Sequence, residues 1–473
     1  MDDDAFDADR FRADGHRVVD LLADYLGRAQ RRELPVLDAG DPDARVAALP
    51  APAEGPVMGL DDLVLRTLAG SNHLHHPGYV GHQVTAPLPD TALLAMVGAL
   101  LNNGMAVYEM GPESTAMERV CVRFLARKLG FPPTSDGVLT SGGSVGNLTA
   151  LLAARAHATS LHAPHVPHVP KTIVASPAAH YSVSRAAGIL GLGEGGLTEA
   201  VPDDDRKLRA PAVADALSRA RQAGRHVIAV VASACSTATG TFDALDEIAD
   251  VCEREGVWLH VDGAHGASAA LSTRHRSLVS GIERADSVVW DAHKMMLVPA
   301  LVTACLFRDG RRSYETFSQE ASYLFAARDP RGAPGDSWYD LGTRTLECTK
   351  RMMSLELYGA LALHGERYFD SYVTRMFDLA RAFADRIEAA PDFELFARPE
   401  ANIVCFRHVR AGVDLTQDEL QTRLRRAVLA SGSHYLVQTT LTHGVYLRTT
   451  LVNPRTTEQD LAMLLDALRH MLQ

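Results

Sequence analysis

The stretch SVVWDAHKMM, residues 287–296, sets a short apolar run directly before Asp291, His293 and Lys294. A run of this length and composition is typical of a buried strand, so these polar side chains are expected where the strand ends. A lysine there, shielded by two methionines, would lose hydration. That loss makes an amine easier to deprotonate and hence able to attack a carbonyl. For this motif alone, a surface lysine at a strand end is the alternative interpretation.

Further apolar runs lie on both sides of this stretch, separated by segments with helical periodicity. The runs are KTIVAS (171–176), HVIAVVAS (226–233), VWLHVDG (257–263) and LVTACLF (301–307), and two of the helical segments are 91–104 and 113–130. Such alternation is typical of βαβ units in a mostly parallel sheet that is covered on both faces. The sequence therefore predicts a large α/β domain.

The two ends of the chain differ from this central region. The first 70 or so residues indicate helices, split by a Pro/Ala/Gly-rich segment (34–56) that we expect to be a surface linker or extended arm. Residues 349–390 are long enough for one or two helices. The runs 393–409 and 444–453, with a closing helix, predict a small α+β domain. The predicted division is an N-terminal helical segment (1–75), a large domain (76–365) and a C-terminal domain (366–473).

Composition limits the classes of function. The chain has 473 residues, 47% hydrophobic and 22% charged, as in globular proteins of two or three domains. A net charge of −11 argues against nucleic acid or an anionic membrane as partner, which leaves small molecules or proteins. Six scattered cysteines fit a reducing cytoplasm. The acidic start lacks a signal-peptide core and no stretch reaches membrane-span length, so we expect a soluble, cytoplasmic protein.

The histidines of LHAPHVPHVP (161–170) are spaced by three, which could suggest a metal site. Prolines stand between His162, His165 and His168, and they prevent the three side chains from sharing one helical face. We therefore predict a solvated loop and no metal.

Three other polar stretches follow predicted strands, where open parallel sheets bind their ligands. In LTSGGSVGNLTALLAAR (139–155), residues 141–144 open a helix whose free N–H groups would face an anion such as phosphate. Asp262 ends a nearly apolar strand, where a carboxylate is costly unless it meets a cation or a protonated ring nitrogen. His180 follows a strand and leads a helix, so it could stack on a ligand ring. A helix cap, a loop cap and a structural histidine are the alternatives.

One cofactor would use all four features. Pyridoxal 5′-phosphate has a phosphate, a ring that can be stacked, a pyridine nitrogen that must stay protonated, and an aldehyde that a lysine holds as a Schiff base. Each of these requirements has a candidate residue in this chain.

The sequence resembles the group II pyridoxal-phosphate-dependent amino-acid decarboxylases, which act on glutamate, cysteine sulfinate, 2,4-diaminobutyrate and aromatic amino acids. SVVWDAHKMM is close to the family's His-Lys signature, particularly in its glutamate branch. The segments HHPGYVGHQVTA (75–86), MGPESTAMERVCVRFLARKLGFP (110–132) and YLRTTLVNPRTT (446–457) resemble further family segments in the same order. Where the glutamate branch usually reads Asn-Pro, this chain has Asp291 and Ala292.

The resemblance implies a type I aminotransferase-like fold with a mostly parallel, seven-stranded type of sheet, and a homodimer with active sites near the subunit interface. It implies that Lys294 forms the Schiff base, His180 stacks on the ring and Asp262 pairs with the ring nitrogen. The other implied cofactor-binding residues are Gly143, Ser144, Val145, Thr237, Ala264, Asp291 and His293. The implied substrate-binding residues are His82, Thr85 and Arg448, of which Arg448 would hold the α-carboxylate.

The activity implied is decarboxylation of an L-amino acid to its amine, and His82 favours an acidic substrate such as aspartate, glutamate or cysteine sulfinate. Diaminobutyrate or an aromatic substrate is the alternative. The predicted mobile loop, 326–339, has no tyrosine before Tyr339, the candidate for returning the final proton. If Tyr339 does not reach the site, another carbanion fate, oxidative deamination to an aldehyde or transamination, becomes the alternative.

Overall fold

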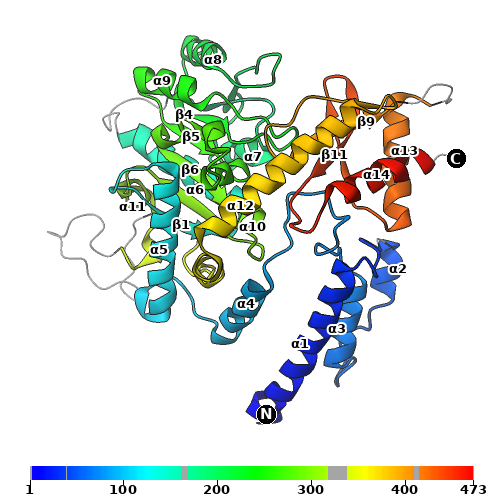
Figure 1. The fold of residues 1–473 in the computed structure, drawn as a ribbon. Coiled ribbons are helices and arrows are strands. Elements are labelled where there is room, and N and C mark those ends of the chain that lie inside the picture. The colour runs from blue at the N-terminus through cyan, green and yellow to red at the C-terminus, as the bar shows by residue number, and fades with distance from the viewer. Residues whose placement is uncertain (1–2, 39, 161–168, 318–337, 410–414, 472–473) are drawn as a thin grey trace. The chain divides into compact units, whose positions relative to one another are not determined.

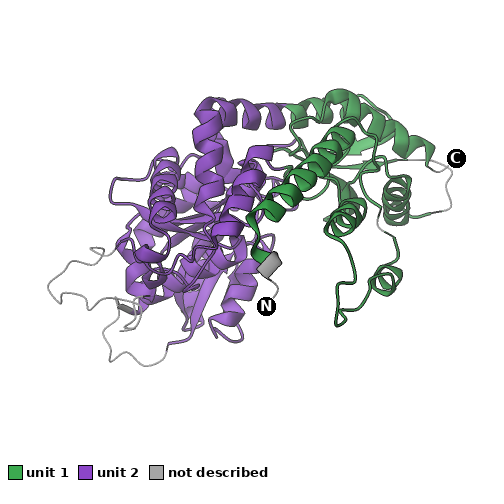
Figure 2. Ribbon diagram, turned by 90° about the horizontal axis from the view of Figure 1, so that it is seen from below, with its two compact units in different colours: residues 1–86, 379–398, 402–473 green, residues 87–378, 399–401 purple. Residues whose placement is uncertain are grey.

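The computed structural model describes residues 3–38, 40–160, 169–317, 338–409 and 415–471. The chain divides into two compact units (Figure 2). Unit 1 comprises Met1–Ala86, Leu379–Arg398 and Asn402–Gln473, and unit 2 comprises Pro87–Asp378 and Pro399–Ala401. The division at residues 75 and 365 that the sequence suggested stays a prediction.

Unit 2 is built on a seven-stranded sheet in the order β1-β7-β6-β5-β4-β2-β3. Figure 1 labels β1, β4, β5 and β6 of this sheet. Its strands are β1 (Asp136–Thr140), β2 (Lys171–Ala175), β3 (Leu197–Glu199), β4 (His226–Ser233), β5 (Leu259–Asp262), β6 (Ser287–Asp291) and β7 (Thr303–Phe307). Only β7 runs antiparallel to its neighbours within this sheet. The predicted α/β class with a mostly parallel sheet is therefore confirmed. β3 has three residues, too few to show a periodic pattern in the sequence.

The helices of unit 2 are α4 (Pro89–Leu101), α5 (Pro112–Leu129), α6 (Gly143–Ser160), α7 (Tyr181–Ile189), α8 (Ala210–Gln222), α9 (Leu245–Glu255), α10 (Ala292–Met295), α11 (Arg311–Phe317) and the first part of α12 (Ser354–Glu388). Helices α5 to α10 pack against strands of the sheet, and α11 packs against α6. α6 lies over the middle strands. A Cβ added at Gly146 would stand 3.1 Å from the Val289 side chain, so glycine lets the start of α6 approach β6 closely.

Residues 349–390, expected to form one or two helices, contain α12, which is interrupted at Gly365. Gly365 has φ +72°, a left-handed conformation that glycine adopts without steric cost. Two helical stretches therefore meet at this residue.

Unit 1 contains the predicted smaller α+β domain. Its four-stranded sheet has the order β10-β11-β9-β8, with β8 (Phe393–Leu395), β9 (Ile403–His408), β10 (Val437–Leu441) and β11 (Gly444–Thr450), and its helices include α13 (Gln417–Ser431) and α14 (Glu458–His470). β10, absent from the sequence prediction, forms an antiparallel pair with β11.

The N-terminal helices of unit 1 are α1 (Ala8–Gln30), α2 (Pro42–Ala47) and α3 (Leu60–Ala69). The expectation of an extended linker over 34–56 is wrong for α2. Asp41 accepts a hydrogen bond from the Ala44 N–H at 2.8 Å and Pro42 occupies the first turn, which together start a helix.

Among the helices of the described residues, none is long and apolar enough to cross a membrane. Within the same residues no group of three or more His, Cys, Asp or Glu side chains could hold a metal ion. His162, His165 and His168 lie outside the described residues.

Candidate active site

A cavity of about 160 Å³ lies at the carboxyl ends of the central strands of unit 2. Asp262 and Asp291, the last residues of β5 and β6, reach it, as does the start of α6. The predicted residues that line it are Gly143, Ser144, His180, Thr237, Asp262, Ala264, Asp291, His293 and Lys294. Val145 follows in the first turn of α6 and is not one of the lining residues. The sequence interpretation missed Asn147, Ser233, Cys235 and His265, which also line it.

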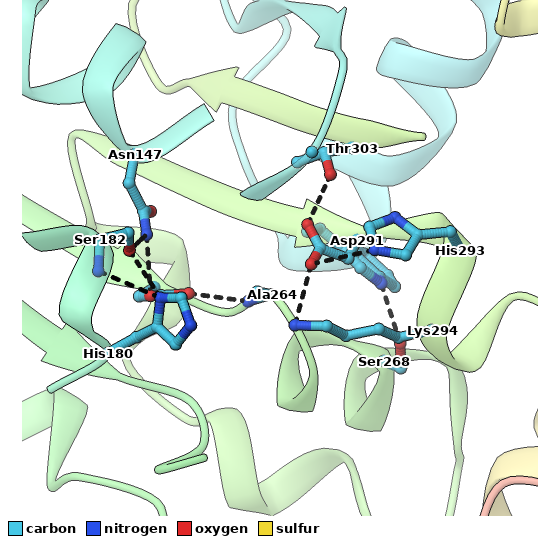
Figure 3. Close-up of polar contacts among 12 residues, drawn as sticks. Asn147, His180, Ser182, Ala264, Ser268, Asp291, His293, Lys294 and Thr303 are labelled. Atoms are coloured by element: carbon cyan, nitrogen blue, oxygen red, sulfur yellow. Dashed lines mark hydrogen bonds and ion pairs between the residues drawn. The ribbon is translucent and has the colours of Figure 1, made fainter. Parts of the chain in front are cut away.

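Lys294 lies one turn beyond the strand end. β6 stops at Asp291 and the four-residue helix α10 follows, which turns the Lys294 amine back toward the Asp291 carboxylate (Figure 3). Their Nζ and Oδ2 atoms are 2.9 Å apart. Met295 and Met296 are fully buried, and the Lys294 side chain is 18% exposed.

The ion pair changes the expected chemistry of Lys294. Burial lowers the pKa of its amine, but the charge of Asp291 and the hydrogen bond to it outweigh burial and leave the pKa raised. The hypothesis that lost hydration would ease deprotonation is therefore wrong for the protein in this state. Lys294 is an ammonium ion at neutral pH, held by a carboxylate.

Asp291 is held from three sides. The Thr303 hydroxyl, directly across the β6–β7 ladder, donates to Oδ1 at 2.6 Å, and His293 Nε2 lies 3.7 Å from Oδ2 (Figure 3). Burial raises the pKa of Asp291, but Lys294, His293 and Thr303 together leave it lowered. A Cβ added at Gly143 would stand 3.1 Å from both carboxylate oxygens, closer than an ordinary van der Waals contact, so glycine lets the α6 N-terminus approach without displacing them.

Asp262 has a different set of partners. The Ala264 N–H donates to its Oδ1 at 3.2 Å, and the Asn147 amide donates to its Oδ2 at 2.9 Å. Both donors are neutral, so neither bond cancels the negative charge of this carboxylate.

His180 is the N-cap of α7 and is half-buried in the cavity wall. Its Nδ1 lies 2.8 Å from the Ser182 hydroxyl and accepts from the Ser182 N–H at 3.3 Å. Burial lowers the pKa of His180; Asp262 partly opposes this and Lys294 adds to it. The imidazole is therefore neutral at pH 7.

The three predicted substrate-binding residues belong to unit 1. The His82 ring lies 5.8 Å from the Tyr435 ring, and the Thr85 hydroxyl lies 3.3 Å from the Val452 carbonyl. Arg448 is buried in β11. Burial lowers the pKa of His82, and the positive charges of Arg448 and Arg425 lower it further. His82 therefore sits in a region of positive potential.

Tyr339 is not one of the residues that line the cavity. Its ring lies 5.5 Å from that of Tyr108, and the side chain is 38% exposed. The other residues of the predicted loop up to 337 lie outside the described residues.

The cavity residues fit pyridoxal 5′-phosphate by their chemistry. Lys294 is an amine for the aldehyde, Asp262 is a carboxylate with neutral partners for a protonated nitrogen, and the α6 N-terminus offers free N–H groups to a phosphate. Gly143 leaves the opening of that helix without a side chain in the way.

Comparisons with known proteins agree with this chemistry. Residues 61–409 match the family model described as the pyridoxal-dependent decarboxylase conserved domain. The chain is 29% identical over 461 residues to the L-2,4-diaminobutyrate decarboxylase of Rhizobium meliloti, covering 96% of this chain and 90% of that one. It is 30% identical over 406 residues to an acidic amino acid decarboxylase of Mus musculus, covering 83% and 73%. The crystal structure of mouse CSAD superimposes with a TM-score of 0.89 at 25% identity, covering 99% of each chain.

Proposed function

Because the chain belongs to the pyridoxal-dependent decarboxylase family, we propose that it removes carbon dioxide from an acidic L-amino acid, such as aspartate, glutamate or cysteine sulfinate, and releases the amine. The observation that carries the choice of substrate is the positive potential at His82. Arg448 and Arg425 both act on this imidazole, so a substrate side chain next to it would be favoured if it were negative. The acidic amino acid decarboxylase of Mus musculus, at 30% identity, supports the same class.

In this proposal Lys294 holds the cofactor aldehyde, Asp262 holds the ring nitrogen and His180 covers the ring. Gly143 and Ser144 at the α6 N-terminus, with His293 just after β6, hold the phosphate, and Asp291 next to them is the counterion of Lys294. When bound, the cofactor supplies an electron sink for the bond that carbon dioxide leaves.

In this proposal the substrate is oriented by Arg448, His82 and Thr85, as the family resemblance implies. Arg448 is the residue that binds the α-carboxylate, since a guanidinium can form paired hydrogen bonds with it. His82 and Thr85 contact the side chain. After carbon dioxide leaves, a proton must reach the substrate carbon, and His180, in the cavity wall, or Tyr339 donates it.

A homodimer is part of the proposal. On α4, five apolar side chains are 43–67% exposed: Leu93, Met96, Val97, Leu100 and Leu101. Solvent-exposed apolar surface concentrated on one helix suits contact with a second copy. Sedimentation of wild type and Leu100→Glu tests this, and a monomeric wild type would contradict it. None of the six cysteines, all of which the structure describes, forms a disulfide, which supports a reducing compartment such as the cytoplasm.

The deciding experiment measures carbon dioxide, amine and peroxide from purified holoenzyme with a panel of L-amino acids. We expect turnover of acidic substrates and stoichiometric amine. Turnover of aromatic or basic amino acids alone would refute the acidic-substrate proposal.

Two alternatives have specific support, and the same panel decides them. Similarity to the Rhizobium meliloti enzyme over 96% of the chain favours L-2,4-diaminobutyrate. Tyr339 packs against Tyr108 and does not line the cavity, which favours an aldehyde product, because a tyrosine that does not reach the substrate cannot return the proton. Stoichiometric peroxide from wild type would establish the aldehyde route, and an amine product unchanged in Tyr339→Phe would exclude Tyr339 as donor.

A further inference from the structure

Asn147 stands at the centre of a buried hydrogen-bond chain behind the cavity. It lies on the second turn of α6 and is 1% exposed. Its Nδ2 donates to Asp262 Oδ2 at 2.9 Å and to the Ser182 hydroxyl at 2.8 Å (Figure 3), and its Oδ1 lies 2.9 Å from His260 Nε2. One amide of α6 therefore joins His260 and Asp262 of β5 to Ser182 of α7.

The direction of each bond follows from what each group can donate. A carboxylate only accepts, so the NH₂ of Asn147 must face Asp262, and its carbonyl oxygen must face His260. His260 then carries its proton on Nε2. It is fully buried, and burial lowers its pKa to about 4, so the ring is neutral and its Nδ1 is an acceptor.

The end of this hydrogen-bond chain that is far from the cavity lies in the core. His260 Nδ1 lies 2.9 Å from the hydroxyl of Ser287, its neighbour in the β5–β6 ladder, and that hydroxyl accepts from Trp258 Nε1 at 2.9 Å. The Ser287 proton is thus directed to His260. Each of these side chains is at most 5% exposed, so no bulk water competes for the bonds.

The end of the hydrogen-bond chain that is near the cavity contacts His180. Because the Ser182 oxygen accepts from Asn147, its own proton is free to be donated to His180 Nδ1, which also faces the Ser182 N–H. With Nδ1 accepting, neutral His180 carries its proton on Nε2.

We propose that Asn147 is a positioning residue that fixes the carboxylate of Asp262 for the cofactor ring nitrogen and, through Ser182, fixes the Nε2–H tautomer of His180. This rests on the proposed function, which gives Asp262 and His180 their contacts with the ring. Without Asn147, one oxygen of Asp262 would lose its amide donor, and the carboxylate could rotate away from the orientation that a ring nitrogen needs.

The test compares two ligands in the full-length apoprotein: pyridoxal 5′-phosphate and its analogue with carbon in place of the ring nitrogen. Dissociation constants are measured by equilibrium dialysis for wild type, Asn147→Leu and His260→Phe. The matched control is Thr149→Val, a buried polar residue of the same helix whose hydroxyl donates to the Val145 carbonyl at 2.8 Å and, among the described residues, makes no bond to the cavity. Thermal melting reports folding.

Asn147→Leu should weaken binding of the natural cofactor about 10-fold, the effect of one lost hydrogen bond to a charged group, while leaving the carbon analogue within about 2-fold. His260→Phe should also weaken binding of the natural cofactor, but by a smaller factor. Asn147 is still present in this variant and loses only the hydrogen bond that orients its amide. Thr149→Val should change neither constant.

Equal weakening of both ligands in Asn147→Leu and His260→Phe would overturn the proposal, since these residues would then only shape the cavity. If wild type itself binds both ligands equally, the pairing of Asp262 with the ring nitrogen fails, and the proposed cofactor contacts fail with it. If Asn147→Leu does not fold, His260→Phe decides alone by the same criterion.

Discussion

Asp262 and Asp291 end neighbouring strands, β5 and β6, and line the same cavity, yet they are held in opposite ways. Asp291 pairs with the ammonium of Lys294, whereas Asp262 is bound by the Asn147 amide and the Ala264 N–H, both neutral. The charge of Asp291 is thus matched by a cation of the protein itself. The hydrogen bonds of Asp262 orient its charge without cancelling it, which leaves it available to a cationic ligand.

This difference also explains a departure in the sequence. Relatives in the glutamate branch usually have asparagine at position 291. An aspartate there would add a negative charge next to a phosphate, which is unfavourable. Its charge is shared among Lys294, His293 and Thr303, which keep its pKa lowered. Asp291 is therefore better understood as the counterion of Lys294 than as a phosphate ligand.

The largest effect is expected for Lys294→Ala. Turnover should fall by at least about 10³-fold, because the amine that attacks the cofactor aldehyde is gone. Borohydride reduction of wild-type holoenzyme should attach the cofactor mass to Lys294, and the variant should stay unlabelled in the mass spectrum. Unchanged circular dichroism would show that folding is intact. Catalysis at ordinary rates would contradict the role of Lys294.

Asp262→Asn keeps the size of the side chain and removes its charge. We expect kcat to fall by about 10²-fold or more, because the ring nitrogen would lose the partner that keeps it protonated. Affinity for the natural cofactor should fall, while affinity for the ring-carbon analogue should not. A fully active variant would mean that another carboxylate serves the ring.

Asp291→Asn tests the other carboxylate by the rate at which apoprotein binds the cofactor. Attack on the aldehyde needs the unprotonated amine, and Asp291 raises the pKa of Lys294. Without this charge, the pH profile of the association rate, followed by stopped-flow absorbance, should move about one to three units toward lower pH. An unshifted profile would contradict control of Lys294 by Asp291.

The same variant should be less stable than wild type at neutral pH. Folding lowers the pKa of Asp291, so the stability from its charge is lost as pH falls through the folded value. Folding raises the pKa of Lys294, so the stability from the Lys294 charge is lost as pH rises through its pKa in the folded state. In urea titrations the difference from wild type should therefore be largest near neutrality and shrink toward both extremes.

Thr303→Val should have the smallest effect, since it removes one hydroxyl bond to Asp291 and keeps the ion pair. We expect a loss of about 1 kcal/mol in the free energy of unfolding, measured by urea titration. Thr140→Val, at the directly paired position on β1, is the control, because within the part of the chain that the structure describes the Thr140 hydroxyl makes one long contact, 3.4 Å to the Gly142 carbonyl. Equal losses in both variants would show that the hydrogen bond to Asp291 contributes no more to the free energy of unfolding than the long Thr140 contact does.

Much of the fold could be predicted because its signals are local. Apolar runs mark β2, β4, β5, β6 and β7, and helical periodicity marks α4 and α5, since burial sorts side chains along each element. The errors also have local causes. Asp41 and Pro42 start α2 inside a segment that composition assigned to a linker, and three-residue β3 leaves no periodic pattern.

By itself, the sequence determined that His180, Asp262 and Lys294 stand at or just after the ends of strands, where parallel sheets bind ligands. It could do so because a local run of apolar residues shows where each strand ends. Only the tertiary structure decided which partner each of them has. Asn147 meets Asp262 across 115 positions, and Thr303 meets Asp291 through strand register. A hydrogen bond or ion pair acts within a few ångströms, so it exists only once packing has brought distant segments together. The partner of Lys294 is closer along the chain: Asp291, three residues before it, raises its pKa against the effect of burial, and the turn of α10 brings the two groups together.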